Sequence, residues 1–206
     1  MVGLALQRDI ARDALSNSHA FFLIHGRRFF PEQAFFIPDT ASQMTPDDYC
    51  YNLAVSPGSD FRYSLLGLPL AQRQALTAVG AFCAETAQIV DECRDSGVAR
   101  TKLDWWRAEL GHLYAGEPQH PITRALRPCL VAFDLPEEYF REILDGVAMD
   151  LDFDAYPDFA ALTLYLHRRG SVPALLTAEI LRYRDRRATP RFAHEAGAML
   201  LAFELL

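Results

Sequence analysis

The sequence has little of what marks several common protein classes. Its 206 residues carry 20 lysines and arginines against 27 aspartates and glutamates, a formal net charge of -7. Nucleic-acid-binding proteins need a basic stripe, so this balance argues against that class. No apolar run approaches the roughly 20 residues of a membrane-spanning helix, and no charged-then-apolar pattern marks a signal peptide at the start. We therefore predict a cytoplasmic protein without a transmembrane segment, and peripheral contact with a membrane stays open.

Cysteine is scarce and scattered. The four cysteines, at positions 50, 83, 93 and 129, form no C-x-x-C pair. We interpret them as buried thiols in a reducing compartment rather than as zinc ligands or a disulfide framework. The histidines at 112, 167 and 194 lack metal-ligand spacing and are interpreted as surface or core residues.

Alternating apolar and polar residues, the pattern of a half-buried strand, are absent, and the chain instead reads as helices separated by proline and glycine. The sequence therefore predicts an all-α fold. Asp158 is predicted to cap a long helix that Gly170 and Pro173 kink. The expected helices cover residues 69–96, 98–114, 121 onward, 136–153, 158–183 and 189–206.

Residues 1–43 differ from the rest because they carry aromatic pairs without a sustained helical period. The pattern restarts after Met44, where Thr45 can cap a helix and Pro46 can occupy its first position. We predict a loosely ordered N-terminal extension over 1–43 and a helical domain over 44–206. A real but loosely packed arm is the alternative for the first segment.

Four stretches together resemble the squalene/phytoene synthase family, most closely its bacterial presqualene diphosphate synthase branch. They are Phe61 to Pro69, Ala78 to Cys83 with Ile89 to Glu92, Val98 to Leu110 followed by His120-Pro121, and Phe133 to Asp152. The paired tryptophans before Arg-Ala-Glu-Leu and the Met-Asp-Leu-Asp sequence are the most specific parts. The order and spacing match from residue 44 to 206.

This resemblance implies an isoprenoid (terpenoid) synthase-type helical bundle that joins two farnesyl diphosphates head to head into presqualene diphosphate. In the family, Mg²⁺ neutralises the leaving diphosphate and is held by two D-x-x-x-D motifs on facing helices, because hard oxygen ligands suit this ion. By resemblance, Tyr165 is a catalytic residue and Asp91 a metal ligand. Phe61, Tyr63 and Ser64 are expected to bind farnesyl diphosphate or a similar prenyl diphosphate.

The sequence departs from the family where the chemistry takes place. The first acidic motif should cover positions 87–91, but Ala87 and Gln88 leave only Asp91 of its acids. A family tyrosine is replaced by Gly80 and a phosphate-binding arginine by Ala84.

Two further positions depart in the same way. A serine near a diphosphate is replaced by Asp60, which would repel that anion. A small apolar residue lining the tail pocket has become Arg169. The second acidic motif is expected beyond Leu206, where an uncapped apolar helix breaks off. We therefore expect the C-terminal helices of the bundle to be missing from this chain.

Three interpretations follow: a truncated piece of a functional prenyltransferase, a non-catalytic family member kept as a binding or assembly partner, or a gene remnant. The absent acids at 87 and 88 favour impaired catalysis, and the apolar end suggests homo- or hetero-oligomers through the truncated face.

Several local features have plainer interpretations. Asp91 and Asp95 could form a late D-x-x-x-D pair but are better explained as two acids at a helix end. The acids at 150, 152 and 154 lack the glycine of an EF-hand. Trp105 and Trp106 are expected to pack in the core.

Overall fold

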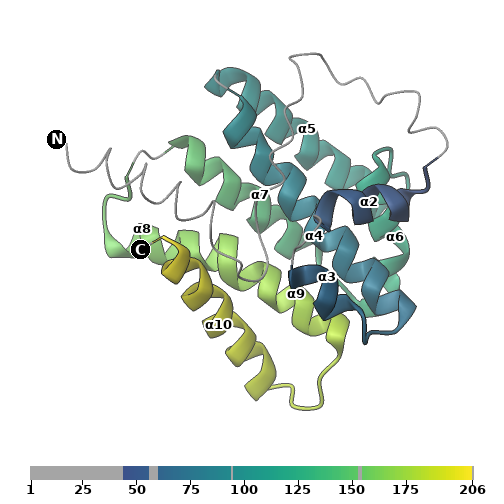
Figure 1. Cartoon of the computed structure of the whole chain (residues 1–206). Helices are drawn as coiled ribbons and strands as arrows, with labels where there is room; N and C mark the ends of the chain where they lie inside the picture. Colours follow the sequence, from purple (N-terminus) through teal and green to yellow (C-terminus); the bar gives the residue numbers. More distant parts are fainter. Residues whose placement is uncertain (1–43, 56–59, 94, 153–154, 206) are drawn as a thin grey trace.

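The computed structural model describes residues 44–55, 60–93, 95–152 and 155–205, and within these ranges every regular element is a helix (Figure 1). The all-α prediction is confirmed. The elements are α2 (Pro46–Ala54), α3 (Asp60–Leu65), α4 (Leu70–Glu92), α5 (Ser96–Ala115), α6 (Pro121–Phe133), α7 (Glu137–Asp152), α8 (Phe159–Leu166), the π-helical segment η2 (His167–Ser171), α9 (Val172–Leu181) and α10 (Ala188–Glu204).

Capping residues define the helix ends that the sequence predicted most clearly. Thr45 caps α2 by accepting a hydrogen bond from the Asp48 N–H, and Pro46 occupies the first position. Asp158 caps α8 through the Ala161 N–H. α5 ends at Gly116, whose φ of 87° is left-handed, a conformation that glycine adopts without steric cost.

Other boundaries differ from the prediction. The short helix α3 was not anticipated. The helix expected to continue to residue 96 ends at Glu92, and α5 begins at Ser96. α10 begins at Ala188, where the Asp185 carboxylate accepts hydrogen bonds from two backbone N–H groups. At the starts of α5 and α10, an aspartate close in sequence, Asp95 or Asp185, accepts hydrogen bonds from backbone N–H groups that would otherwise lack a partner.

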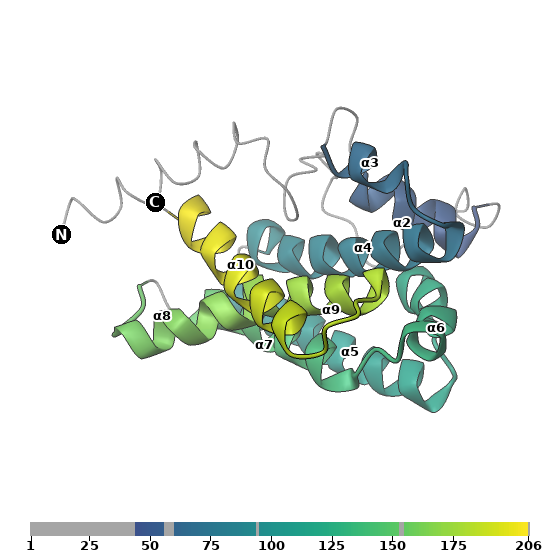
Figure 2. The same cartoon turned by 90° about the horizontal axis from the view of Figure 1, so that it is seen from below.

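The long helix α4 lies at the centre of the domain and contacts α2, α5, α6, α7 and α9 (Figure 2). The core around it contains perpendicular aromatic pairs. The Phe82 ring on α4 packs edge-on against Trp106 of α5 and Phe140 of α7, each with a centroid distance of 5.4 Å. Edge-to-face pairs of this kind add to the stabilisation from apolar burial. Trp106 is buried in the core, as expected, and Trp105 is half-buried and packs against it.

The α-helical pattern is interrupted after α8, in the region where Gly170 and Pro173 predict a kink. The chain passes from α8 through the π-helical turn η2 into α9 without leaving helical conformation. Such π segments mark places where one residue is inserted into an α-helix. α10 packs against η2 and α9 at the edge of the domain (Figure 1).

The predicted extension, residues 1–43, lies outside the described part of the chain, so the division into 1–43 and 44–206 stays a prediction.

Three of the cysteines are buried, Cys93 is half-buried, and all four are free thiols. No helix within the described ranges is long and apolar enough to cross a bilayer.

Candidate functional site

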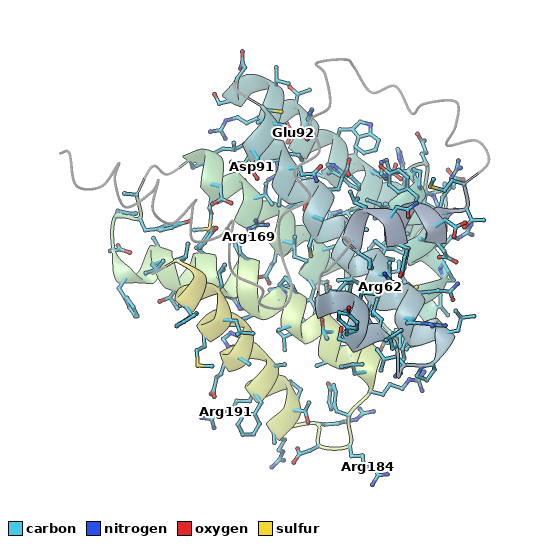
Figure 3. All side chains as sticks on the ribbon, in the orientation of Figure 1. Arg62, Asp91, Glu92, Arg169, Arg184 and Arg191 are labelled. Atoms are coloured by element: carbon cyan, nitrogen blue, oxygen red, sulfur yellow. The ribbon has the colours of Figure 1, made fainter. Side chains whose placement is uncertain are left out.

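The last turns of α4 contain the only acid that remains at the position of the expected first metal-binding motif. Asp91 is exposed near the end of the helix, and Ala87, four residues earlier, is buried with 8% exposure (Figure 3). Residues four apart lie on one helix face. The face that should present two carboxylates therefore presents one carboxylate and one methyl group.

Asp95 does not supply the missing carboxylate. It lies beyond the end of α4 and caps α5, where its Oδ1 accepts hydrogen bonds from the N–H groups of Gly97 and Val98 at 2.7 and 3.4 Å. The expectation of two acids at the end of one helix was wrong for Asp95. A carboxylate at a helix N-terminus is favoured by the helix dipole.

The donors around Asp91 do not fit a magnesium ion by themselves. Mg²⁺ demands near-octahedral oxygen coordination, commonly from carboxylates and substrate phosphates. In the described ranges no group of three or more histidine, cysteine, aspartate or glutamate side chains is arranged to hold a metal. We therefore derive no catalytic step through a metal at Asp91.

Glu85 is a titratable carboxylate on α4 that the sequence did not single out. Burial and, to a smaller extent, the nearby charge of Glu92 raise its pKa to about 6, with Lys102 opposing the shift. The charge of Glu85 in turn adds to the burial that raises the pKa of Tyr49. This carboxylate is therefore partly protonated near neutral pH.

The residues predicted to bind substrate lie on α3. Phe61 is half-buried and its ring contacts the Gly80 region of α4, where an added Cβ would lie 3.6 Å from two ring atoms. Ser64 donates a hydrogen bond of 2.7 Å to the Phe61 carbonyl, and Tyr63 is 65% exposed. Phe61 thus occupies space next to the position that lost a tyrosine. The side chain of Asp60 lies outside the described residues.

Tyr165 is buried in a polar cluster inside the domain. Its ring stacks obliquely on Tyr156 with centroids 4.9 Å apart. Its hydroxyl interacts by hydrogen bonding with Arg169 and Asp150. Burial and Asp150 raise the pKa of Tyr165, while the Arg169 charge lowers it, with a net increase. The tyrosine therefore stays protonated and held by an internal ion pair.

Arg169 and Asp150 form that ion pair. The Arg169 Nε and Asp150 Oδ2 atoms are 3.7 Å apart, and the arginine side chain is 6% exposed. Burial disfavours the charged guanidinium, but Asp150 and Tyr165 outweigh this effect and raise the pKa of Arg169. The sequence showed that Arg169 departs from the small apolar residue of the family, but it did not predict the pairing with Asp150.

Arg169 is one of three consecutive basic residues that pair with α7. The His167 Nε2 atom lies 2.9 Å from Glu142 Oε2, and Arg168 lies 3.8 Å from Asp145. All three partners lie on α7, so three consecutive residues of η2 hold that segment against one helix. The sequence did not reveal this pattern, because the partners are distant in sequence.

His167 and His194 also meet, although their sequence separation gave no signal. The His167 Nδ1 and His194 Nε2 atoms are 3.1 Å apart, which joins η2 to α10. His112 approaches Glu109 at 3.4 Å. The interpretation of these histidines as surface or core residues is consistent with their places in the helices.

Glu109 is the buried carboxylate that sequence reasoning missed. Its Oε1 atom accepts hydrogen bonds from the backbone N–H groups of Gln119 and His120, at 2.7 and 2.8 Å, and from the Thr123 hydroxyl. Burial alone would raise the pKa of Glu109, but these hydrogen bonds lower it below its usual value. Glu109 therefore fixes the connection between α5 and α6 rather than facing a ligand.

Comparison with known proteins gives the family. Residues 54–204 match the family model of squalene/phytoene synthase. The presqualene diphosphate synthase of Rhodopseudomonas palustris is 34% identical over 137 residues, which is 66% of this chain and 48% of that protein. The corresponding enzyme of Zymomonas mobilis is 32% identical over 145 residues, 69% of this chain and 49% of that protein.

The chain is also similar to a phytoene synthase in sequence and to a solved squalene synthase in fold. The phytoene synthase of Arthrospira platensis is 30% identical over 134 residues, 65% of this chain and 43% of that protein. The fold resembles the crystal structure of squalene synthase HpnC from Alicyclobacillus acidocaldarius, with a TM-score of 0.66, 23% identity, and coverage of 76% of this chain and 58% of that one. The chain spans about half the length of the relatives it matches in sequence. It belongs to the squalene/phytoene synthase family.

Proposed function

We propose that this chain is a squalene/phytoene synthase family member whose head-to-head condensation of two farnesyl diphosphates is impaired. The observation that carries the proposal is the pair Ala87 and Asp91 on α4, where one carboxylate is exposed and its expected partner is a buried methyl group. The prenyl diphosphate as ligand comes from the relatives and is part of the proposal.

The chemistry explains why this change matters. When a diphosphate leaves an allylic carbon, negative charge develops on its oxygens, and bound metal ions stabilise that charge by several kcal/mol. With alanine at 87 and glutamine at 88, Asp91 is the one acid left at the expected motif positions 87, 88 and 91 of α4, and one carboxylate cannot hold such ions with the geometry that Mg²⁺ requires. Each 1.36 kcal/mol of lost stabilisation slows the reaction about tenfold, so losing several ligands removes many orders of magnitude.

Two further substitutions support impairment. Ala84, one turn before Gln88, offers no cation to a phosphate group. Asp60 begins α3 and adds negative charge to the segment that includes Phe61, which disfavours binding of an anion nearby. Neither change introduces a substitute donor for the diphosphate.

Labelled farnesyl diphosphate with Mg²⁺ tests the proposal. The unmodified chain should give no product. The comparison variant carries Ala87→Asp and Ala84→Arg, which restore an acidic and a basic group, and Asp60→Ser, which removes the repelling acid. Turnover by the unmodified chain near that of the Zymomonas mobilis enzyme, assayed in parallel, would refute the impairment.

A binding or assembly role is the second candidate, and the outer face of α10 supports it. Phe192, Met199 and Phe203 are 69%, 66% and 75% exposed, and their spacing of seven and four residues places them on one helix face. Gly197 and Leu201, on the opposite face, are buried. Exposed apolar surface of this kind is typical of protein contacts.

Sedimentation equilibrium of the purified chain tests this second role. Self-association that Phe192→Ser and Phe203→Ser together weaken supports assembly through α10. A strictly monomeric chain at high concentration that also binds no family synthase counts against it.

A further inference from the structure

The connection between α9 and α10 concentrates positive charge in an otherwise acidic chain. Five of the 20 lysines and arginines lie within ten residues, at positions 182, 184, 186, 187 and 191, and all five are exposed. We call residues 182–191 the arginine segment. Figure 3 shows Arg184 and Arg191 at the edge of the domain opposite Asp91 and Glu92 of α4. The chain therefore presents a basic surface at this edge although its formal net charge is -7.

Most of this charge has no carboxylate partner. Asp185 is the one acid within the segment, and its Oδ1 atom accepts two backbone N–H groups at the start of α10, at 2.9 and 2.8 Å. Of the five arginines, Arg191 alone forms an ion pair among the described residues, with Glu195 at 2.9 Å. Three exposed guanidinium groups can therefore meet an external anion without breaking an ion pair described here: those of Arg184, Arg186 and Arg187.

Contacts with the rest of the fold hold the segment in place. The Arg182 Nη2 atom donates a hydrogen bond of 3.0 Å to the Ala132 carbonyl, and its guanidinium lies over the Phe133 ring, 5.6 Å from the centroid. The Gln72 amide of α4 donates to the carbonyls of the last two residues of α9, at 3.0 and 3.3 Å. Because the backbone is already fixed, binding an external surface requires less ordering of the chain.

Apolar side chains flank the arginines on both sides. Leu181, the last residue of α9, is 43% exposed, and Phe192, near the start of α10, is 69% exposed. Cations next to large apolar side chains suit the boundary between the headgroups and acyl chains of a bilayer. A duplex nucleic acid would attract the cations but would leave Leu181 and Phe192 in water. The combination therefore favours a membrane over a soluble polyanion.

We propose that the arginine segment, together with Leu181 and Phe192, is the surface through which this chain docks on an anionic membrane. The guanidinium groups attract lipid phosphates, and Phe192 enters the headgroup region. Each basic residue close to such a surface strengthens binding about fivefold, and salt screens that attraction. The inference goes beyond the proposed function and does not depend on whether condensation survives.

Co-sedimentation of the whole chain with vesicles tests the docking surface. One set of vesicles contains equal parts of phosphatidylcholine and phosphatidylglycerol, and the other contains phosphatidylcholine alone. The unmodified chain should bind the anionic vesicles at least about tenfold more tightly than the neutral ones, and added salt should weaken this binding. The triple variant Arg184→Ser, Arg186→Ser and Arg187→Ser should bind the anionic vesicles about a hundredfold more weakly. Serine at 187 occupies the N-cap of α10, a position that it favours, so the helix start is kept.

A second triple variant controls for net charge. Arg100→Ser, Arg124→Ser and Arg141→Ser remove three exposed arginines from α5, α6 and α7, so the net charge changes equally. Binding should stay within about threefold of the unmodified chain, because salt screens charges that lie far from the membrane.

Phe192→Ser separates a membrane from a soluble polyanion. This variant should bind anionic vesicles about tenfold more weakly, since an apolar side chain no longer enters the bilayer. Equal binding of the unmodified chain to both kinds of vesicle would overturn the proposal, as would equal losses in the two triple variants. Binding to duplex DNA that is tighter than binding to the anionic vesicles, and that Phe192→Ser leaves unchanged, would assign the segment to a polyanion instead. None of these results involves turnover, so failure of the proposed function is recognised separately, by condensation product from the unmodified chain.

Discussion

Gly170 in the π-helical turn and Gly197 in α10 bring two helical segments into backbone contact. A Cβ built at Gly197 would lie 2.3 Å from the Gly170 carbonyl oxygen, and one at Gly170 would lie 2.5 Å from the Gly197 oxygen. Since neither atom belongs to a flexible side chain, a larger residue cannot be accommodated by rotation. The position of α10 therefore depends on two glycines.

Gly197→Ala should destabilise the chain by about 2 to 4 kcal/mol, because α10 must move away from η2 to relieve the overlap. Gly111→Ala is the matched control, since nothing lies within 4 Å of an added Cβ inside α5. Alanine there should stabilise by up to about 1 kcal/mol. Urea unfolding measures both, and a neutral Gly197→Ala would contradict the described contact.

His120 should make the chain sensitive to acid. Burial lowers its pKa to about 4, and its Nδ1 accepts the Ile122 N–H at the start of α6. Because the folded state disfavours the proton, this contribution to stability is complete above pH 6.5 and is lost as the pH falls toward 4. The full loss is about 3 kcal/mol.

The difference in unfolding free energy between the chain and His120→Asn isolates this effect. Asparagine keeps an N-cap acceptor but does not titrate. The advantage of histidine over asparagine should shrink between pH 7 and pH 4.5, and a constant difference across that range would rule out the shifted histidine.

Glu85 should give stability the opposite dependence on pH from that of His120. Its folded pKa of about 6 lies above the ordinary value of 4.5, so the folded state binds the proton more tightly. Stability from this group is complete below pH 4.5 and is lost as the pH rises through 6. Glu85→Gln should therefore stabilise the chain by about 2 kcal/mol at pH 7.5 and change little at pH 4. If Glu85→Gln were less stable than the unmodified chain at pH 7.5, the ionised Glu85 carboxylate would be stabilised in the folded state, which contradicts the raised pKa.

Glu109 should be essential for stability, not for ligand binding. Glu109→Ala leaves the N–H groups of Gln119 and His120 and the Thr123 hydroxyl without their acceptor, and each lost partner in a buried site costs about 1 to 3 kcal/mol. We expect a total loss above about 3 kcal/mol by thermal unfolding. The exposed Glu117 serves as the control, and its replacement by alanine should change little. A loss as small as that of the control would refute the anchoring role.

The sequence predicted those features that depend on local chemistry. Thr45 and Asp158 were recognised as caps because a short polar side chain before a helical pattern satisfies nearby N–H groups. The family was recognised from apolar and aromatic stretches that form the core, including Trp106. These signals need no knowledge of what lies across the fold.

The missed features depend on partners distant in sequence or on exact helix phase. Asp95 looked like the end of one helix because the sequence did not show that α4 ends at Glu92, three residues before Asp95 caps α5. The pairing of Arg169 with Asp150 joins η2 to α7, and no periodic pattern in the sequence signals that contact. The anchoring role of Glu109 was missed because its three donors lie 10 to 14 residues later in the chain.

A single-turnover experiment tests impaired condensation most directly. The chain, in excess over tritiated farnesyl diphosphate and with saturating Mg²⁺, is incubated for hours, so that even a slow reaction accumulates product. The account predicts no labelled presqualene diphosphate or squalene above a protein-free control. Mg²⁺-dependent product formed by the unmodified chain within the time that the Zymomonas mobilis enzyme needs would contradict it.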